Sequence, residues 1–131
     1  MKILFICKYN RFRSRIAEAY FKKINKNKKI RIDSCGLIKG NPVSKTTISV
    51  AKKFGINVKG KTKGLDEKVL KSIDLLIIVA DNVPKSIFKK FNRKIIVWEI
   101  EDASQNNKKD IEKVIKRIMN KVENLAKDLE K

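Results

Sequence analysis

Short apolar runs alternate with amphipathic stretches along the chain, and this alternation predicts strands that alternate with helices. Four runs rich in β-branched and aromatic residues are bounded by polar or glycine-containing segments, as strands are. They cover residues 3–6, 30–34, 74–80 and 94–98. The first run and the stretch from Leu75 to Ala80 contain no polar side chain, which is typical of strands that are buried on both faces.

Between these runs, apolar residues at spacings of three and four predict helices. The helices are expected at about residues 14–25, 44–54, 66–73, 81–91 and 107–129. Ser14 and Ser44 are of the type that caps helix starts, and Gly55 is suited to a helix end. Pro84 would occupy the first turn of its helix. The apolar stripe of the last helix is interpreted as core-facing, because it is too short for a coiled-coil partner site. It consists of Ile111, Ile115, Ile118, Val122, Leu125 and Leu129.

Strands that alternate with helices form a parallel sheet with helices on both sides. We therefore expect a single domain over residues 1–131, of the three-layer α/β/α class with a four-stranded parallel sheet. In such a sheet ligands bind at the carboxyl ends of the strands. The segments that would converge there are Cys7, Ser34, Asp81 and the loop after Trp98.

Length and composition are those of an ordinary folded domain. The chain has 131 residues, of which 42% are hydrophobic, so it has enough apolar surface to bury a core. No apolar run is long enough to cross a bilayer, and Met1-Lys2 leads directly into the first strand without a signal-peptide profile. We expect a cytoplasmic protein without a membrane partner.

The formal net charge of +19 suggests two interpretations. One is attraction to nucleic acid or to phosphorylated, acidic partners. The other is a lysine-rich composition spread over the whole surface, which we favour because lysines occur from Lys8 to Lys131. No basic segment is interleaved with aromatic residues in the manner of RNA-binding proteins, so we do not expect nucleic acid as a partner. The positive field would still attract anionic substrates, with a strong dependence on salt.

The chain has two cysteines and no histidine. The absence of histidine excludes Cys-His and Ser-His nucleophile pairs and histidine metal sites, and two cysteines are too few for structural zinc. We expect neither a metal nor a cofactor. Cys7 and Cys35 are expected to stay reduced, because a cytosolic protein keeps its thiols reduced and a thiol that follows a strand is more often functional.

The stretch from Cys7 to Arg13 lies between the first strand and the first helix. Its residues predict an anion-binding site that contains a nucleophile. A strand-loop-helix unit directs backbone N–H groups and the positive end of the helix dipole into one concavity, and a thiol there ionises easily. Arg13 adds a planar fork for two phosphate oxygens. Phosphoryl transfer suits these groups: Cys7 would attack phosphorus, a carboxylic acid would protonate the leaving oxygen, and Ser14 would donate to the sulfur.

This stretch resembles the phosphate-binding loop of the low-molecular-weight protein-tyrosine phosphatases. The shared features are an apolar strand, a cysteine, five further residues, Arg-Ser and a helix with Ile-Ala-Glu-Ala. Segments along the rest of the chain match as well, at residues 33–36, 54–56, 78–81 and 98–102. The resemblance implies the fold of that family, which arsenate reductases share.

The resemblance also implies roles for individual residues. Cys7 would be the nucleophile, Arg13 the phosphate clamp and Asp102 the general acid. Ser34 and Asp81 would support the site, and Asn10 would hold the loop in shape. The remaining residues of the loop would bind substrate, together with Asn10: Lys8, Tyr9, Arg11, Phe12 and Ser14.

Three positions depart from the family pattern. Tyr9 stands where the family has glycine, so a positive φ there would be strained. Phe12 replaces the second loop cysteine, which removes the reversible disulfide that the family can form. Ala103 replaces the proline after the acid.

The resulting hypothesis is a hydrolase of phosphate monoesters, a protein-tyrosine phosphatase, that acts through a phosphocysteine. Its partners would be a phosphorylated protein or a small phosphate monoester, with inorganic phosphate as product. The alternatives are a phosphate- or phosphoprotein-binding module with little turnover, and an arsenate reductase. A nucleic-acid binder driven by charge is a further rival.

Overall fold

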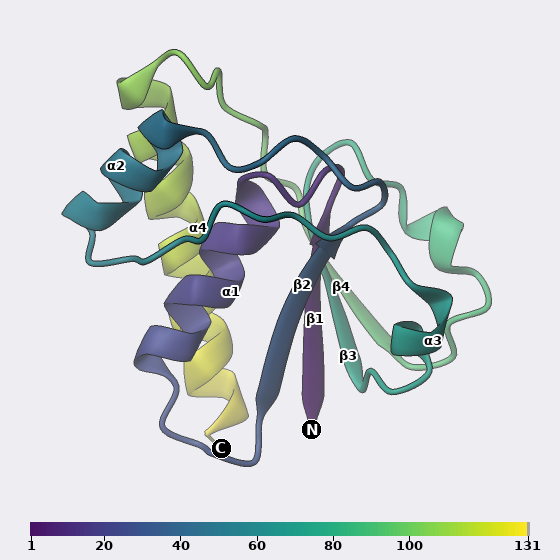
Figure 1. Ribbon diagram of the computed structural model, residues 1–131. Coiled ribbons are helices and arrows are strands. Elements are labelled where there is room, and N and C mark those ends of the chain that lie inside the picture. The colour runs from purple at the N-terminus through teal and green to yellow at the C-terminus, as the bar shows by residue number, and fades with distance from the viewer. Residues whose placement is uncertain (131) are drawn as a thin grey trace.

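The computed structural model describes residues 1–130, which form a four-stranded parallel sheet flanked by helices (Figure 1). All four predicted strands are present, in the spatial order β2-β1-β3-β4. Their bounds are β1 Lys2–Cys7, β2 Arg31–Gly36, β3 Leu75–Val79 and β4 Lys94–Trp98. The α/β fold class predicted from the alternating pattern is therefore confirmed.

The central strands β1 and β3 explain why their sequences are apolar throughout. Every residue of β3, and every residue of β1 after Lys2, is buried because both faces of the sheet are covered. The edge strands are more polar, and β4 exposes Lys94 and Val97. The predicted second strand ended before Cys35, but β2 continues to Gly36 because Gly36 pairs with Cys7 at the end of β1.

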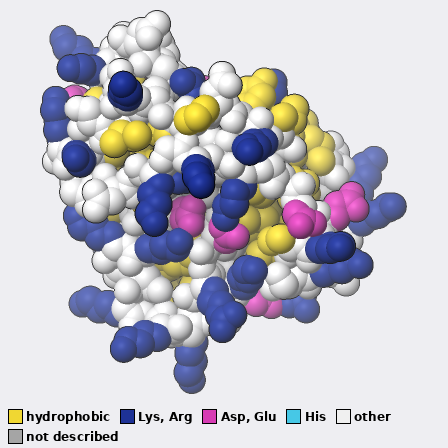
Figure 2. Space-filling view, in the orientation of Figure 1, with side chains coloured by type: hydrophobic (Ala, Val, Ile, Leu, Met, Phe, Trp, Pro, Cys, Tyr) yellow, Lys and Arg dark blue, Asp and Glu magenta, His cyan; other side chains and the backbone are white. Residues whose placement is uncertain are grey.

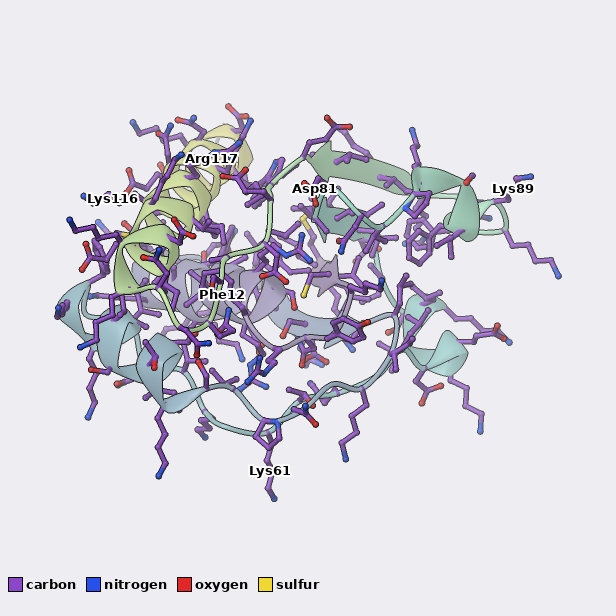
Figure 3. All side chains as sticks on the ribbon, turned by 90° about the horizontal axis from the view of Figure 1, so that it is seen from above. Phe12, Lys61, Asp81, Lys89, Lys116 and Arg117 are labelled. Carbon is purple, nitrogen blue, oxygen red and sulfur yellow. The ribbon has the colours of Figure 1, made fainter. Side chains whose placement is uncertain are left out.

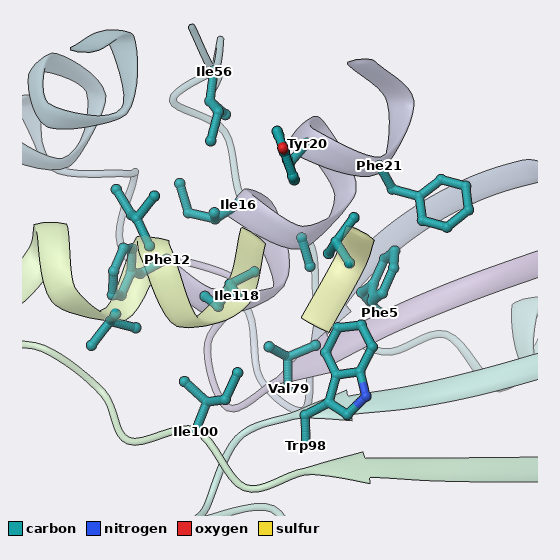
Figure 4. Close-up of a cluster of buried hydrophobic side chains, with 14 of the residues drawn as sticks. Phe5, Phe12, Ile16, Tyr20, Phe21, Ile56, Val79, Trp98, Ile100 and Ile118 are labelled. Carbon is teal, nitrogen blue, oxygen red and sulfur yellow. The ribbon is translucent and has the colours of Figure 1, made fainter. Parts of the chain in front are cut away.

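Three helices cover one face of the sheet: α1 Arg13–Ile24, α2 Lys45–Lys53 and α4 Lys108–Leu129. The core between them and the sheet contains the apolar stripe of α4 and an aromatic group from β1, α1 and β4 (Figure 4). The Phe5 ring lies 6.2 Å from the Phe21 ring and 5.8 Å from the Trp98 ring, measured between centroids. Such contacts hold α1 in place at the end of β1.

The other face of the sheet has a thinner cover. It consists of the one-turn helix α3 Glu67–Leu70 and a 3₁₀ turn, η1, at Lys85–Phe88. The helix predicted over residues 81–91 is thus wrong in type and length. Pro84 takes an extended conformation, with ψ of 137°, so the chain begins its single turn only after the proline. Ile73 and Phe88 are buried against this face of the sheet.

The helix caps follow the prediction at Ser44 and fail at Ser14. Ser44 Oγ accepts from Thr47 N at 3.1 Å, and Gly55 takes the positive φ of 71° that ends α2. In contrast, α1 begins at Arg13, after Phe12, without a side-chain cap. Ser14 lies inside the helix, because its hydroxyl contacts Cys7 instead. The first N–H groups of α1 therefore have no side-chain acceptor, which leaves them available to an anion.

No helix within residues 1–130 combines the length and the apolar character that a membrane crossing requires.

Candidate active site

The β1–α1 loop, residues 8–12, lies at the carboxyl edge of the sheet and follows directly on Cys7, the last residue of β1. The segment after β2 holds its outer side by three backbone bonds. Leu37 N donates to Cys7 O at 3.0 Å, Ile38 N to Lys8 O at 3.1 Å, and Gly40 N to Tyr9 O at 3.1 Å. These bonds extend the pairing of β1 with β2 beyond the ends of the two strands. The start of the loop therefore continues the sheet before the chain turns into α1.

The thiol of Cys7 has one polar neighbour, Ser14. Cys7 Sγ and Ser14 Oγ are 3.0 Å apart, and both side chains are buried. Asn10 Nδ2 donates to the same Ser14 oxygen at 2.8 Å. When Cys7 is a thiolate it can only accept, so the Ser14 hydroxyl is then the donor and stabilises the charge on sulfur.

Asn10 ties the loop to two other parts of the chain. Its Nδ2 also donates to Ser34 Oγ at 3.0 Å, and its Oδ1 accepts from Lys63 N at 2.9 Å. Ser34 in turn donates to Glu18 Oε1 of α1. The backbone bond from Lys63 fixes which end of the amide is the acceptor. The network thus joins β2, α1 and the 59–63 segment beneath the loop.

The guanidinium of Arg13 is buried and held by the loops that follow β3 and β4. Its Nη1 donates to Ile100 O at 2.9 Å and to Asp81 Oδ1 at 3.5 Å. Its Nη2 donates to Asn82 Oδ1 at 3.0 Å and lies 3.8 Å from Asp102 Oδ2. The carboxylates of Asp81 and Asp102 are about half exposed, at 49% and 53%. One arginine therefore gathers both predicted carboxylates around the loop.

The backbone strain expected at Tyr9 does not occur. Within residues 1–130, the non-glycine residue with a positive φ is Asn10, at 55°, and asparagine tolerates this conformation. Tyr9 instead needs glycine opposite it. A Cβ on Gly40 would lie 2.7 Å from Tyr9 Cβ, and one on Gly36 would lie 2.5 Å from the Tyr9 carbonyl carbon. Gly40 thus leaves room for the Tyr9 side chain, and Gly36 leaves room for the Tyr9 backbone.

A model of the family described as low molecular weight phosphotyrosine protein phosphatase matches residues 2–131. The chain belongs to this family.

Individual relatives of this phosphatase family differ in the activity that their names state. The glutaredoxin arsenate reductase of Synechocystis sp. is 29% identical over 133 residues, which cover 95% of each protein. The low molecular weight protein tyrosine phosphatase of T. tengcongensis has a TM-score of 0.85 at 24% identity, covering 98% of this chain and 99% of its own. The YwlE arginine phosphatase from Geobacillus stearothermophilus has a TM-score of 0.85 at 16% identity, covering 98% and 92%. At such identities these two structures establish a shared fold.

Within this phosphatase fold, the predicted loop residues divide into two groups. Phe12 is 3% exposed and packs in the core, so only its backbone can face a phosphate (Figures 3 and 4). Lys8, Tyr9 and Arg11 lie at the outer side of the loop. Lys8 Nζ is 5.4 Å from the centroid of the Tyr9 ring, and Arg11 Nε donates to Pro42 O at 3.1 Å.

Sequence reasoning missed two polar residues of the site. Asn82 contacts Arg13 directly, and Glu18 receives the hydroxyl of Ser34. The position of Asn82, one residue beyond Asp81 at the end of a strand, was a usable signal. Glu18 belongs to the Ile-Ala-Glu-Ala stretch of the family resemblance, but no role was predicted for it, because a glutamate on a helix is usually solvated.

The second cysteine, Cys35, is buried beside the site on β2. Burial, followed by the charges of Asp33 and Cys7, raises the pKa of the Cys35 thiol to about 12. Both cysteines are free thiols. Residues 1–130 contain no group of three or more His, Cys, Asp or Glu side chains that is placed to hold a metal ion.

Proposed function

We propose that this protein hydrolyses phosphate monoesters, with phosphotyrosine in proteins as the substrate class, through a phosphocysteine on Cys7. One observation carries most of the weight: Cys7 Sγ lies 3.0 Å from Ser14 Oγ in the first turn of α1. The sulfur therefore has its own donor and the positive end of a helix beside it. A buried polar network holds this arrangement before any substrate binds, as catalysis by positioning requires.

In the first step, sulfur attacks phosphorus and the bond to the ester oxygen breaks. The phosphoryl oxygens would be bound by N–H groups of the β1–α1 loop and by Arg13. Three of the five N–H donors of Arg13 are engaged, whereas its Nε–H and one N–H of Nη2 make no hydrogen bond to residues 1–130 and are left for two oxygens of the phosphate.

Asp102 would supply the proton for the leaving oxygen. Its Oδ1 accepts from Ala103 N at 2.9 Å, which orients the carboxyl group, and its other oxygen lies on the side of Arg13. In the second step a water attacks phosphorus, Asp102 takes its proton, and the S–P bond breaks. Ser14 would stabilise the departing thiolate, and inorganic phosphate leaves.

The aromatic part of the substrate is supported by apolar side chains at the outer side of the loop. Tyr9 is 41% exposed and Ile38 is 58% exposed, and the two residues belong to segments joined by backbone hydrogen bonds. Together they offer a surface against which a phenyl ring can pack. This supports phosphotyrosine over a small aliphatic phosphate ester.

The test is hydrolysis of p-nitrophenyl phosphate and phenyl phosphate by wild type, Cys7→Ser and Asp102→Asn. Cys7→Ser should abolish turnover of both. Asp102→Asn should lower kcat by about 10²–10⁴-fold for phenyl phosphate and much less for p-nitrophenyl phosphate, because a good leaving group needs no acid. Acid quenching with radiolabelled substrate should trap a phosphocysteine in wild type. A parallel comparison of phosphotyrosyl and phosphoarginyl peptides separates the two side-chain classes.

Two outcomes contradict the proposal. Turnover that is unchanged in Cys7→Ser excludes the covalent mechanism. Inorganic phosphate binding by the wild type without turnover of any monoester identifies a binding module instead.

Arsenate reduction is a second candidate, because a relative at 29% identity is an arsenate reductase and Cys35 lies on the strand next to Cys7. Cys7 would attack arsenate, and a second thiol would attack the sulfur, forming a disulfide as arsenic(V) is reduced to arsenic(III). Cys35 is a poor second thiol, since its raised pKa of about 12 keeps it protonated. Arsenate-dependent loss of two free thiols, absent in Cys35→Ala, would establish this activity.

A further inference from the structure

The segment between Asp33 and Asp66 is strongly basic. Residues 34–65 contain seven lysines and no aspartate or glutamate. Other stretches of the chain are basic as well, such as residues 19–32 with five lysines, one arginine and no acidic residue, so composition alone does not single this segment out. A run of this kind matters only if the fold gathers it at one place.

The fold places two parts of this segment along the outer side of the β1–α1 loop (Figure 1). Gly40 N bonds to Tyr9 O, and Lys63 N bonds to Asn10 Oδ1. The two parts are also joined to each other, because Thr62 Oγ1 donates to Gly40 O at 2.6 Å. Arg15 clamps the second part by donating to the carbonyl oxygens of Lys59 and Lys61.

Four cations form what we call the basic rim: Lys8 and Arg11 of the β1–α1 loop, and Lys39 and Lys61 of the two segments beside it. Lys39 and Lys61 are exposed, and Figure 3 shows Lys61 pointing outward from the edge of the molecule. None of the four forms an ion pair within residues 1–130; the lysine nearest to them that does so is Lys63, with Asp33. Unpaired cations at one edge create a positive potential that a ligand can neutralise.

On the other side of the loop the charges are paired. Asp81 and Asp102 lie there beside Arg13, and Glu101 pairs with Arg117. Of the two sides of the loop, the basic rim is therefore the one with cations that form no ion pair within residues 1–130. Figure 2 shows a face on which dark-blue cationic side chains outnumber magenta ones.

We infer that the substrate is a phosphoprotein segment with acidic residues flanking the phosphorylated side chain, which lie along the basic rim. This inference rests on the proposed function and names its substrate class more closely. An extended peptide advances about 3.3 Å per residue, so flanking positions within a few residues of the phosphate reach Lys39 and Lys61. The other side of the loop, whose charges are paired, offers less to an acidic flank, which favours one direction for the peptide across the site.

A peptide fits this rim better than a nucleic acid does. Single-stranded nucleic acids bind by stacking bases on exposed aromatic rings. Within residues 1–130, Tyr9 is the aromatic residue among the exposed large hydrophobic side chains, and Lys8 Nζ lies over its ring. The rim therefore offers one ring, which suffices for the aromatic group of a single phosphorylated side chain, and lacks the series of rings on which successive bases stack.

The experiment measures peptide binding to Cys7→Ser protein by fluorescence anisotropy. Two phosphotyrosyl peptides are compared, one with three flanking glutamates and one with glutamines in their place. The acidic peptide should bind about tenfold more tightly, with a preference that falls as salt rises. The double variant Lys39→Glu/Lys61→Glu should lose most of this preference, with a smaller change in affinity for the glutamine peptide.

The matched control is Lys26→Glu/Lys28→Glu. These lysines lie in the turn between α1 and β2, at the amino ends of the strands and therefore at the opposite end of the sheet from the loop. This variant changes the net charge of the protein as much as Lys39→Glu/Lys61→Glu does, and it should still bind the acidic peptide more tightly than the glutamine peptide. Equal binding of the two peptides, or equal loss in both double variants, overturns the inference but leaves the proposed function standing. Displacement of the acidic peptide by an unphosphorylated copy or by single-stranded RNA at similar concentration also overturns it. Failure of both peptides to bind, with no turnover of p-nitrophenyl phosphate by wild type, contradicts the proposed function itself.

Discussion

Asn10 holds the β1–α1 loop by means that no neighbouring residue could supply. Its positive φ of 55° suits asparagine, and its amide bonds Ser14, Ser34 and the backbone of Lys63. A buried amide that satisfies donors and acceptors on three segments is costly to disturb, because each group left unpaired loses its hydration without compensation. The loop is therefore shaped before a phosphate arrives.

Asn82 is expected to act as a positioning residue for Arg13. Asn82→Ala removes the acceptor of Arg13 Nη2. The guanidinium is then free to turn towards Asp102 and away from its position beside the loop. Affinity for inorganic phosphate, measured as a competitive inhibition constant, should weaken by roughly fivefold to tenfold, as expected for one lost charge-assisted hydrogen bond. Asn82→Gln keeps a neutral amide acceptor and should retain more of the affinity than Asn82→Ala does. Similar losses in both variants would argue against a positioning role.

At the scale of the element, α1 is organised by its first turn. The helix begins without a side-chain cap, and the serine placed to supply one contacts the sulfur of Cys7. The absence of a side-chain cap lowers the stability of α1 by about 1 kcal/mol. The uncapped N–H groups and the diverted hydroxyl both point to the same small site. Packing of Phe21 on Phe5, at the other end of the helix, compensates by anchoring it to the sheet.

Ser14→Ala tests whether the contact between the Ser14 hydroxyl and the Cys7 sulfur contributes to catalysis. The variant should slow breakdown of the phosphocysteine more than its formation, because the sulfur leaves without a donor only in the second step. In a rapid-quench experiment with p-nitrophenyl phosphate, we expect a larger burst of nitrophenol and a steady-state rate lower by roughly 10–100-fold. A proportional fall in burst rate and steady-state rate would show that Ser14 serves only to shape the loop.

At the scale of the whole molecule, helix packing connects distant parts of the chain on the face opposite α3. Tyr20 of α1 donates to Glu123 Oε1 of α4 at 2.7 Å. Burial, followed by this bond and the charge of Glu123, raises the pKa of Tyr20 to about 12. The bond joins two helices that lie 103 residues apart at this point.

The pH dependence of stability should reveal this bond. Because the folded-state pKa is raised above the usual value of 10, the stabilisation is complete below pH 10 and is lost as pH rises towards 12. Tyr20→Phe should lower the free energy of unfolding in urea by roughly 2 kcal/mol at pH 8, where the bond to a carboxylate is intact. The curves of the two proteins should converge between pH 10 and pH 12. A difference that stays constant over this range would rule out the bond as its source.

Most strands and helices of the fold could be predicted from the local pattern of apolar and polar residues. The apolar runs of β1 and β3 are rich in β-branched residues and short, which favours strands buried on both sides, and the stripe of α4 favours a core-facing helix. Ser44 and Gly55 mark the ends of α2 correctly because capping acts within a few residues. The pattern after β3 misled because Pro84 is compatible both with a helix start and with an extended turn.

The amino-acid sequence by itself determined that Cys7 and Arg13 frame a loop between a strand and a helix, since these residues are close along the chain. Only the tertiary structure decided which residues support them. The contacts of Ser14 with sulfur, of Asn82 with Arg13 and of Asn10 with Lys63 depend on register and side-chain direction. Likewise, the run of lysines after β2 became a basic rim because strand pairing laid that segment beside the loop. Local spacing cannot encode such contacts, because they are formed between segments that only the packed sheet brings together.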